Sequence, residues 1–134
     1  MRTGGCQCGA VRYETVDEPT ELYVCHCLEC RKQSASAFGI SFIVPYRDIT
    51  LTRGAPHFWE RPTDSGGRVR CAFCPDCGSR LWHEDATDPE RASIKGGTLD
   101  EAPDISAVDH IWTKRKMPGV VIPGGARQFP EEPE

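Results

Sequence analysis

Apolar residues along the chain occur in short runs, each closed by glycine, proline or acidic turn residues. The strongest run, Phe38–Val44, ends at Pro45. Runs of this length predict strands, because helices need longer stretches of regular periodicity. The strands expected on this basis are Ala10–Val16, Glu21–Cys25, Phe38–Val44, Ile49–Arg53, His57–Glu60, Arg68–Phe73, Arg80–His83, Ala92–Lys95 and Ile105–Trp112. Their number and spacing predict a mainly β fold.

Only one segment, Leu28–Ala35, is expected to form a helical turn. A chain of 134 residues without a visible repeat is expected to fold as one domain. The last residues, 123–134, are rich in Gly, Pro and Glu. We therefore expect one folded domain over residues 1–122, followed by a loosely held Pro/Glu-rich tail over residues 123–134.

The charge of the chain limits its classes of partner. The formal net charge of −4 argues against a protein that binds phosphate backbones. The compact basic cluster Lys114–Lys116 is typical of a solvated surface. No apolar stretch is long enough to cross a membrane, and the first residues lack the apolar core of a signal peptide. We expect a cytoplasmic protein with no nucleic-acid partner and no membrane partner.

The chain holds eight cysteines, which in a reducing compartment indicate metal binding rather than disulfides. Cys74 and Cys77 form a strong half-site, because two intervening residues let both sulfurs face one point and Gly78 tolerates the tight turn that follows. Cys6 and Cys8 would need a bend to do the same, which the neighbouring glycines permit. Together the two pairs predict a structural zinc with four thiolates.

A second group lies within six residues and consists of Cys25, Cys27 and Cys30. Three protein ligands and a vacant fourth position are typical of a catalytic zinc. With three thiolates the centre carries a formal charge of −1, so it is a weak Lewis acid but suits the binding of another thiolate. The alternative is that Cys71 or His26 closes the site and leaves it inert.

Three motifs resemble the glutathione-dependent formaldehyde-activating enzyme family, which shares its domain with centromere protein V. They are Gly5–Glu14, Cys25–Lys32 and Phe73–Leu81. Weaker matches follow at Gly96–Asp100 and His110–Trp112. The resemblance covers residues 4–115 with the motifs in the expected order.

The resemblance implies a β-tent fold of short antiparallel strands held together by zinc. It implies two zinc ions per chain, one structural and one labile. The structural zinc would be held by Cys6, Cys8, Cys74 and Cys77. The second zinc would lie at the catalytic residues Cys25, Cys27 and Cys30. In the family's named reaction, glutathione adds through sulfur to formaldehyde and gives S-(hydroxymethyl)glutathione. We therefore expect a zinc-dependent carbon–sulfur lyase whose partner is glutathione or another small thiol.

Two other functions fit parts of the pattern. A non-catalytic structural zinc or interaction module of the β-tent fold would keep the same cysteines, although the acidic charge argues against a chromatin role. A methionine-R-sulfoxide reductase has a related fold with two C-x-x-C pairs around zinc. This chain offers no separate late cysteine as the nucleophile of such a reductase.

Four residues besides the seven paired or clustered cysteines have more than one interpretation: Cys71, His26, Arg31 and Lys32. Cys71 is either a small buried hydrophobe, the commoner role of a lone cysteine, or a fourth metal ligand. By alternation, His26 is expected to point away from the metal. Arg31 and Lys32 would either bind a carboxylate of an anionic peptide substrate, or neutralise the anionic centre, or be ordinary surface charges.

Overall fold

The computed structural model describes residues 1–63 and 66–133. Strands account for 42% of the described residues and helices for 12%, which confirms the predicted mainly β class. That the arrangement is a β-tent stays a prediction of the resemblance. The single α-helix of the described residues, α1 (Leu28–Ser34), has seven residues. Within the same residues, no helix has the length and apolarity needed to cross a bilayer.

The strands form two sheets. The smaller sheet is antiparallel, in the order β1 (Arg2–Gly5), β2 (Arg12–Thr15) and β5 (Thr50–Arg53). The larger sheet has the order β10 (Asp109–Ile111), β3 (Glu21–Cys25), β4 (Gly39–Pro45), β9 (Asp88–Lys95), β8 (Arg80–Asp85), β7 (Arg68–Phe73) and β6 (His57–Pro62). Its strands pair antiparallel except β10, which is parallel to β3.

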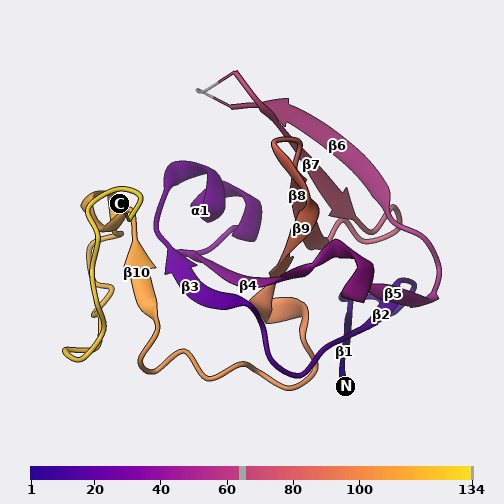
Figure 1. The fold of residues 1–134 in the computed structure, drawn as a ribbon, viewed down its shortest axis with the longest axis horizontal. Helices are drawn as coiled ribbons and strands as arrows, with labels where there is room; N and C mark the ends of the chain where they lie inside the picture. The colour runs from indigo at the N-terminus through magenta and orange to yellow at the C-terminus, as the bar shows by residue number, and fades with distance from the viewer. Residues whose placement is uncertain (64–65, 134) are drawn as a thin grey trace.

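Helix α1 lies between the part of the large sheet that contains β3 and the part that contains β6–β9 (Figure 1). An ion pair of 3.6 Å between Glu29 of α1 and Arg61 of β6 links the helix to the far part. Since β3 runs into α1 after two residues, Cys25 at the end of the strand and Cys30 in the helix are held close together.

The main core lies between the two sheets. Tyr13 of the small sheet is fully buried and meets Trp82 of the large sheet edge to face, with ring centroids 6.3 Å apart. The Tyr13 hydroxyl is 2.7 Å from the Thr98 hydroxyl, so the polar end of this buried ring is satisfied. Phe42 and Ile94, on adjacent strands, complete the apolar contact.

The sequence predicted β3 and β7 with their observed bounds, and it missed β1. Strand β1 has no apolar side chain to signal it. Its Gly4 packs against Tyr13, where an added Cβ would lie 2.5 Å from the phenol oxygen. The predicted strand Ile105–Trp112 was too long, because only Asp109–Ile111 pairs with β3. The residues before it include a turn, in which the Ser106 amide donates to Asp104 over 2.9 Å.

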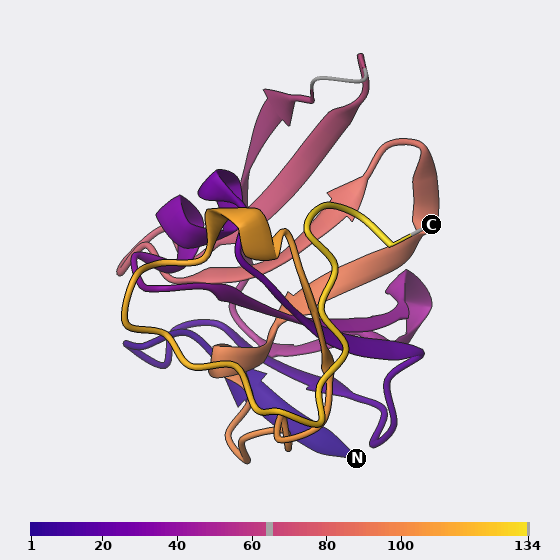
Figure 2. The same cartoon turned by 90° about the vertical axis from the view of Figure 1, so that its left-hand side faces the viewer.

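The described part of the C-terminal tail runs along β10 (Figure 2). The His110 amide donates to the carbonyl of Arg127, and the Phe129 amide donates to the carbonyl of His110, both over 2.9 Å. The Arg127 guanidinium also pairs with Asp109 at 2.7 Å. These contacts order residues 127–129, while the division of the chain after residue 122 stays a prediction.

Candidate metal centres

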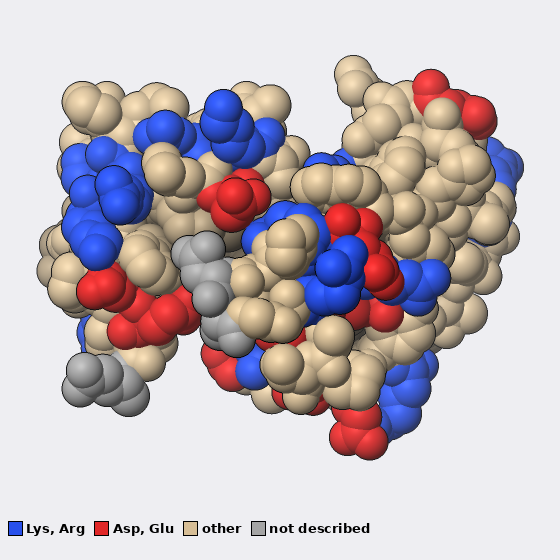
Figure 3. Space-filling model, turned by 90° about the horizontal axis from the view of Figure 1, so that it is seen from above, with Lys and Arg blue, Asp and Glu red and all other residues tan. Residues whose placement is uncertain are grey.

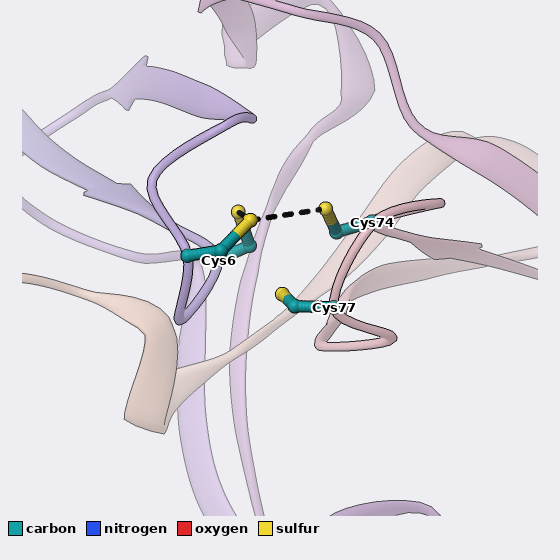
Figure 4. Close-up of side chains that lie close together, drawn as sticks. Cys6, Cys74 and Cys77 are labelled. Atoms are coloured by element: carbon teal, nitrogen blue, oxygen red, sulfur yellow. Dashed lines mark hydrogen bonds between the residues drawn. The ribbon is translucent and has the colours of Figure 1, made fainter.

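Two cysteine pairs that are far apart in the sequence meet in the fold. Cys6 and Cys8 follow β1, and Cys74 and Cys77 follow β7; their four sulfur atoms lie within 4.8 Å of one another. The sulfur of Cys8 is 3.7 Å from that of Cys6 and 3.8 Å from that of Cys74. Figure 4 shows the side chains of Cys6, Cys74 and Cys77 directed toward one point. A tetrahedral zinc with bonds of about 2.3 Å places its sulfurs about 3.8 Å apart, so this centre fits zinc.

Both halves of this centre turn at a glycine. Gly9 and Gly78 each follow the second cysteine of their pair, and each has a φ of 81°, in the left-handed region that glycine tolerates. Their amides donate to the carbonyls of Cys6 (3.2 Å) and Cys74 (2.8 Å). The Val11 amide donates to the sulfur of Cys6 over 3.2 Å. The bends expected from the glycines are thus present.

Hydrogen bonds at the first centre favour a thiolate at Cys77. Cys6 and Cys74 are buried, whereas Cys8 and Cys77 are exposed. The Ser79 hydroxyl lies 3.3 Å from the sulfur of Cys77, and hydrogen bonds to Ser79 lower the pKa of Cys77 to about 6. Four sulfurs would fill the coordination sphere of a metal bound here and leave no position for a substrate, which suits a structural role.

The second centre is local in sequence. Cys25 ends β3, Cys27 caps the N-terminus of α1, and Cys30 lies in its first turn. Their sulfur atoms lie within 4.8 Å of one another. The Cys30 amide donates to the sulfur of Cys27 over 3.3 Å. Because the strand-to-helix junction itself brings the sulfurs together, the centre needs no ligand from another part of the chain.

The three thiols of the second centre do not titrate alike. Hydrogen bonds from Cys25 and Cys30 hold the pKa of Cys27 well below its usual value. Hydrogen bonding to Cys27 and burial raise the pKa of Cys25 well above it. Cys27 is therefore the most acidic of the three thiols, and its hydrogen bonds with Cys25 and Cys30 share their protons. A soft divalent cation could replace the shared protons.

Neither of the two alternative ligands joins these sulfurs. Within the described residues the group contains three cysteines only. Cys71 is buried on β7, where burial raises the pKa of its thiol. The ring of His26 stacks on His110, with centroids 5.1 Å apart and a 2.9 Å contact between Nε2 of His26 and Nδ1 of His110. The expectation that His26 points away from the metal agrees with this geometry.

The histidine pair is a feature that the sequence did not predict. Both rings are buried, and burial lowers the pKa of both, which keeps them neutral at pH 7. Nδ1 of His26 and Nε2 of His110 have no hydrogen-bond partner in the residues described. The only signal was indirect: His26 lies between two candidate ligands, and His110 lies in a later family motif.

A second unpredicted feature is a buried lysine beside the second centre. Lys95 ends β9 and is 8% exposed, and its Nζ lies 3.3 Å from Nε2 of His83. Burial lowers the pKa of Lys95, and the nearby thiols of Cys30 and Cys25 oppose that shift. The sequence placed Lys95 at a strand end and gave no sign that it faces a cysteine centre.

Comparisons with known proteins agree with the arrangement of the cysteines. The sequence profile of the glutathione-dependent formaldehyde-activating enzyme family matches residues 1–115. A Halomonas elongata protein, provisionally named a glutathione-dependent formaldehyde-activating enzyme, is 31% identical over 101 residues, which are 72% of this chain. The matched part spans 64% of the length of that relative.

The fold is also similar to a solved structure. A crystal structure of a Rhodobacter sphaeroides protein superimposes with a TM-score of 0.59 and 23% identity, over 75% of this chain and 90% of that one. At this identity the likeness bears on the fold alone. The profile match, which covers most of the chain and includes both cysteine groups, decides the family. The chain belongs to the glutathione-dependent formaldehyde-activating enzyme family.

Proposed function

We propose that the protein is a zinc-dependent carbon–sulfur lyase that acts on an adduct of glutathione, or of another small thiol, such as S-(hydroxymethyl)glutathione. One observation carries the proposal: Cys25, Cys27 and Cys30 converge without a fourth protein ligand among the described residues. Three ligands leave one position for a substrate sulfur. Family membership supports glutathione as the thiol.

The proposed cofactor content is two zinc ions per chain. Cys6, Cys8, Cys74 and Cys77 would hold the structural ion, and Cys25, Cys27 and Cys30 would hold the labile one. When bound at the second centre, zinc would supply a soft coordination position for the substrate thiolate. In the adding direction, the substrate sulfur forms a bond to the carbonyl carbon, the carbon–oxygen π bond breaks, and the oxygen takes up the proton that the thiol loses. The reaction needs no oxidant or reductant.

The protein's own contribution would be mainly positioning. Two sulfurs of the second centre, those of Cys25 and Cys30, are buried, while Cys27 is partly accessible. The junction of β3 and α1 fixes all three, since a backbone hydrogen bond from Cys30 holds Cys27 in place. A substrate thiol would therefore meet a rigid site whose approach is restricted to one side.

The proposal also includes the extent of the zinc-binding domain and the location of the protein in the cell. The zinc-binding domain would comprise residues 1–122. All eight cysteines are free thiols, which suits a reducing, cytoplasmic setting. We propose a small thiol as the partner, without nucleic acid or membrane.

The alternative is a non-catalytic structural zinc or interaction module. The burial of Cys25 and Cys30 favours it, because a largely covered metal would hold structure without meeting a substrate. An added Cβ at Gly39 would come within 3.1 Å of the Cys30 Cβ, so the strand β4 closely covers this side of the centre.

Cobalt substitution followed by a glutathione titration separates the two functions. The d–d absorption bands of cobalt report its coordination number, and an open three-thiolate site has room for a fourth sulfur. We expect millimolar glutathione to change the bands of one cobalt ion and to leave the other unchanged, because the four-sulfur centre has no vacancy.

The control for this titration is Cys27→Ser, which removes one ligand of the second centre and leaves the first intact. We expect the variant to remain folded and to lose the response to glutathione. Bands in the parent protein that do not respond to glutathione or to other small thiols would favour the structural module, and the lyase proposal would then be wrong.

A further inference from the structure

A cavity of about 530 Å³ is lined by Cys77 of the first centre and reaches Gly39, which packs against Cys30 of the second centre. The C-terminal end of α1, the turn after Cys77 and residues 96–98 form its wall. Gly39 lines it and packs directly against Cys30, and Lys95 lines it as well. We call this the basic cavity. It is large enough for a small peptide-like molecule, whose size class such cavities commonly hold.

The charge of the basic cavity differs from that of the rest of the molecule. Its basic lining residues are Lys95 and Arg80; the wall contains no Asp or Glu, and its acidic group is the thiol of Cys77 at the first centre. The chain as a whole has a net charge of −4. Figure 3 shows basic and acidic side chains next to one another across the middle of the face seen from above. Two cations in one cavity without a carboxylate therefore favour an anionic ligand.

Neither cation has a carboxylate partner in the part of the chain that the structure describes. In residues 1–63 and 66–133, no carboxylate lies within 4.0 Å of the charged nitrogens of Lys95 or Arg80. The Nζ of Lys95 contacts a neutral acceptor, the ring of His83, and Arg80 lies over the Trp59 ring at 5.3 Å. A buried cation is costly where nearby groups offset its charge only in part, and the thiols of Cys30 and Cys25 are the groups near Lys95. A ligand anion would relieve the remaining cost.

The position of Lys95 connects the cavity with the cysteines. Lys95 lines the cavity, and its charge acts on the thiols of Cys30 and Cys25. A molecule whose anionic end is bound by Lys95 could thus extend along the wall at Gly39, which packs against Cys30 of the second centre. The amide and hydroxyl side chains of Gln33 and Ser34, which also line the cavity, can donate further hydrogen bonds.

We propose that the basic cavity binds a carboxylate of the substrate thiol, with Lys95 and Arg80 as the binding cations. The inference deepens the proposed function and rests on it for the identity of the thiol. It selects a substrate class, namely small thiols that carry a carboxylate some distance from sulfur. It also moves carboxylate recognition from Arg31 and Lys32, which do not line the cavity, to residues from β8 and β9.

The test uses S-methylglutathione, whose methylated sulfur is a poor metal ligand, so that binding does not depend on the second metal. Calorimetric titration of the zinc-loaded protein compares this probe with its diethyl ester, in which both carboxylates are masked. We expect the free acid to bind about tenfold more tightly than the ester, the size expected for a charge-assisted hydrogen bond. Lys95→Met should remove most of that preference, and Arg80→Gln should reduce it.

The matched control is Lys32→Met, which removes the same charge from a helix residue outside the cavity and should leave both affinities unchanged. Thermal unfolding of each variant shows whether it is folded. If Lys95→Met does not fold, Arg80→Gln still tests the inference. Equal affinities for acid and ester, no binding of either, or an unchanged preference in both cavity variants would overturn this inference. None of those results depends on whether the cobalt bands respond to glutathione. A failure of the carboxylate-binding inference is therefore distinguishable from a failure of the lyase proposal.

Discussion

At the scale of single residues, Cys71 is a buried thiol that lies outside both cysteine centres. The side chain is 2% exposed on β7, and burial raises the pKa of the thiol. Its strand neighbours are His83 on β8 and Trp59 on β6. A protonated, buried thiol of this kind behaves as a small apolar group rather than as a ligand.

Replacing Cys71 by alanine tests this role. We expect Cys71→Ala to leave the zinc content unchanged and to lower the free energy of unfolding by about 1–2 kcal/mol, the effect of losing one buried atom and leaving a small void. Elemental analysis and chemical denaturation measure the two quantities. Loss of one zinc per chain in this variant would make Cys71 the fourth ligand, and the second centre would no longer be open.

At the scale of elements, Asp100 joins the segment after β9 to the small sheet. Its carboxylate accepts hydrogen bonds from Thr3 of β1 (2.7 Å) and from the guanidinium of Arg12 of β2 (2.9 Å to Oδ1). The Asp100 amide donates to the carbonyl of Thr3 over 2.9 Å. The hydrogen bonds from Arg12 and Thr3 hold the pKa of Asp100 down to about 2.

This depressed pKa predicts the pH dependence of an Asp100→Asn variant. A carboxyl group whose pKa is lower in the folded state stabilises the fold above its unfolded pKa of about 3.9, and the stabilisation is lost as pH falls through the folded value. We expect the variant to melt a few degrees below the parent at pH 7, with a difference that shrinks between pH 4 and pH 2. Melting curves across this range measure it, and a difference that is constant with pH would contradict the assignment.

Prediction from sequence succeeded at the element scale where the deciding interactions are local. The cluster of Cys25, Cys27 and Cys30 depends on a single strand-to-helix junction, so spacing alone located it. Strand β1 could not be predicted, because its glycines are explained only by contacts with other segments, such as that of Gly4 with Tyr13 of β2. The role of Lys95 was hidden for the same reason, since the cavity that it lines is assembled from segments far apart in the chain.

At the scale of the whole molecule, the first centre connects the two sheets. Cys6 and Cys8 follow β1 of the small sheet, and Cys74 and Cys77 follow β7 of the large sheet. A metal bound to both pairs crosslinks parts of the chain that are about seventy residues apart, and its binding energy becomes folding energy. The second centre lies within one junction and crosslinks nothing distant, so the two metals are expected to contribute unequally to stability.

The most direct test of two unequal zinc centres is the zinc content per folded chain, measured by elemental analysis together with thermal unfolding. We predict two zinc ions in the parent protein and one in Cys27→Ser, whose melting temperature should stay close to that of the parent. Cys74→Ser should lose the other ion and melt about 10 °C lower or more, because several kcal/mol of metal-coupled folding energy is lost. A parent protein with a single zinc, or a Cys74→Ser variant that melts with the parent, would contradict the account.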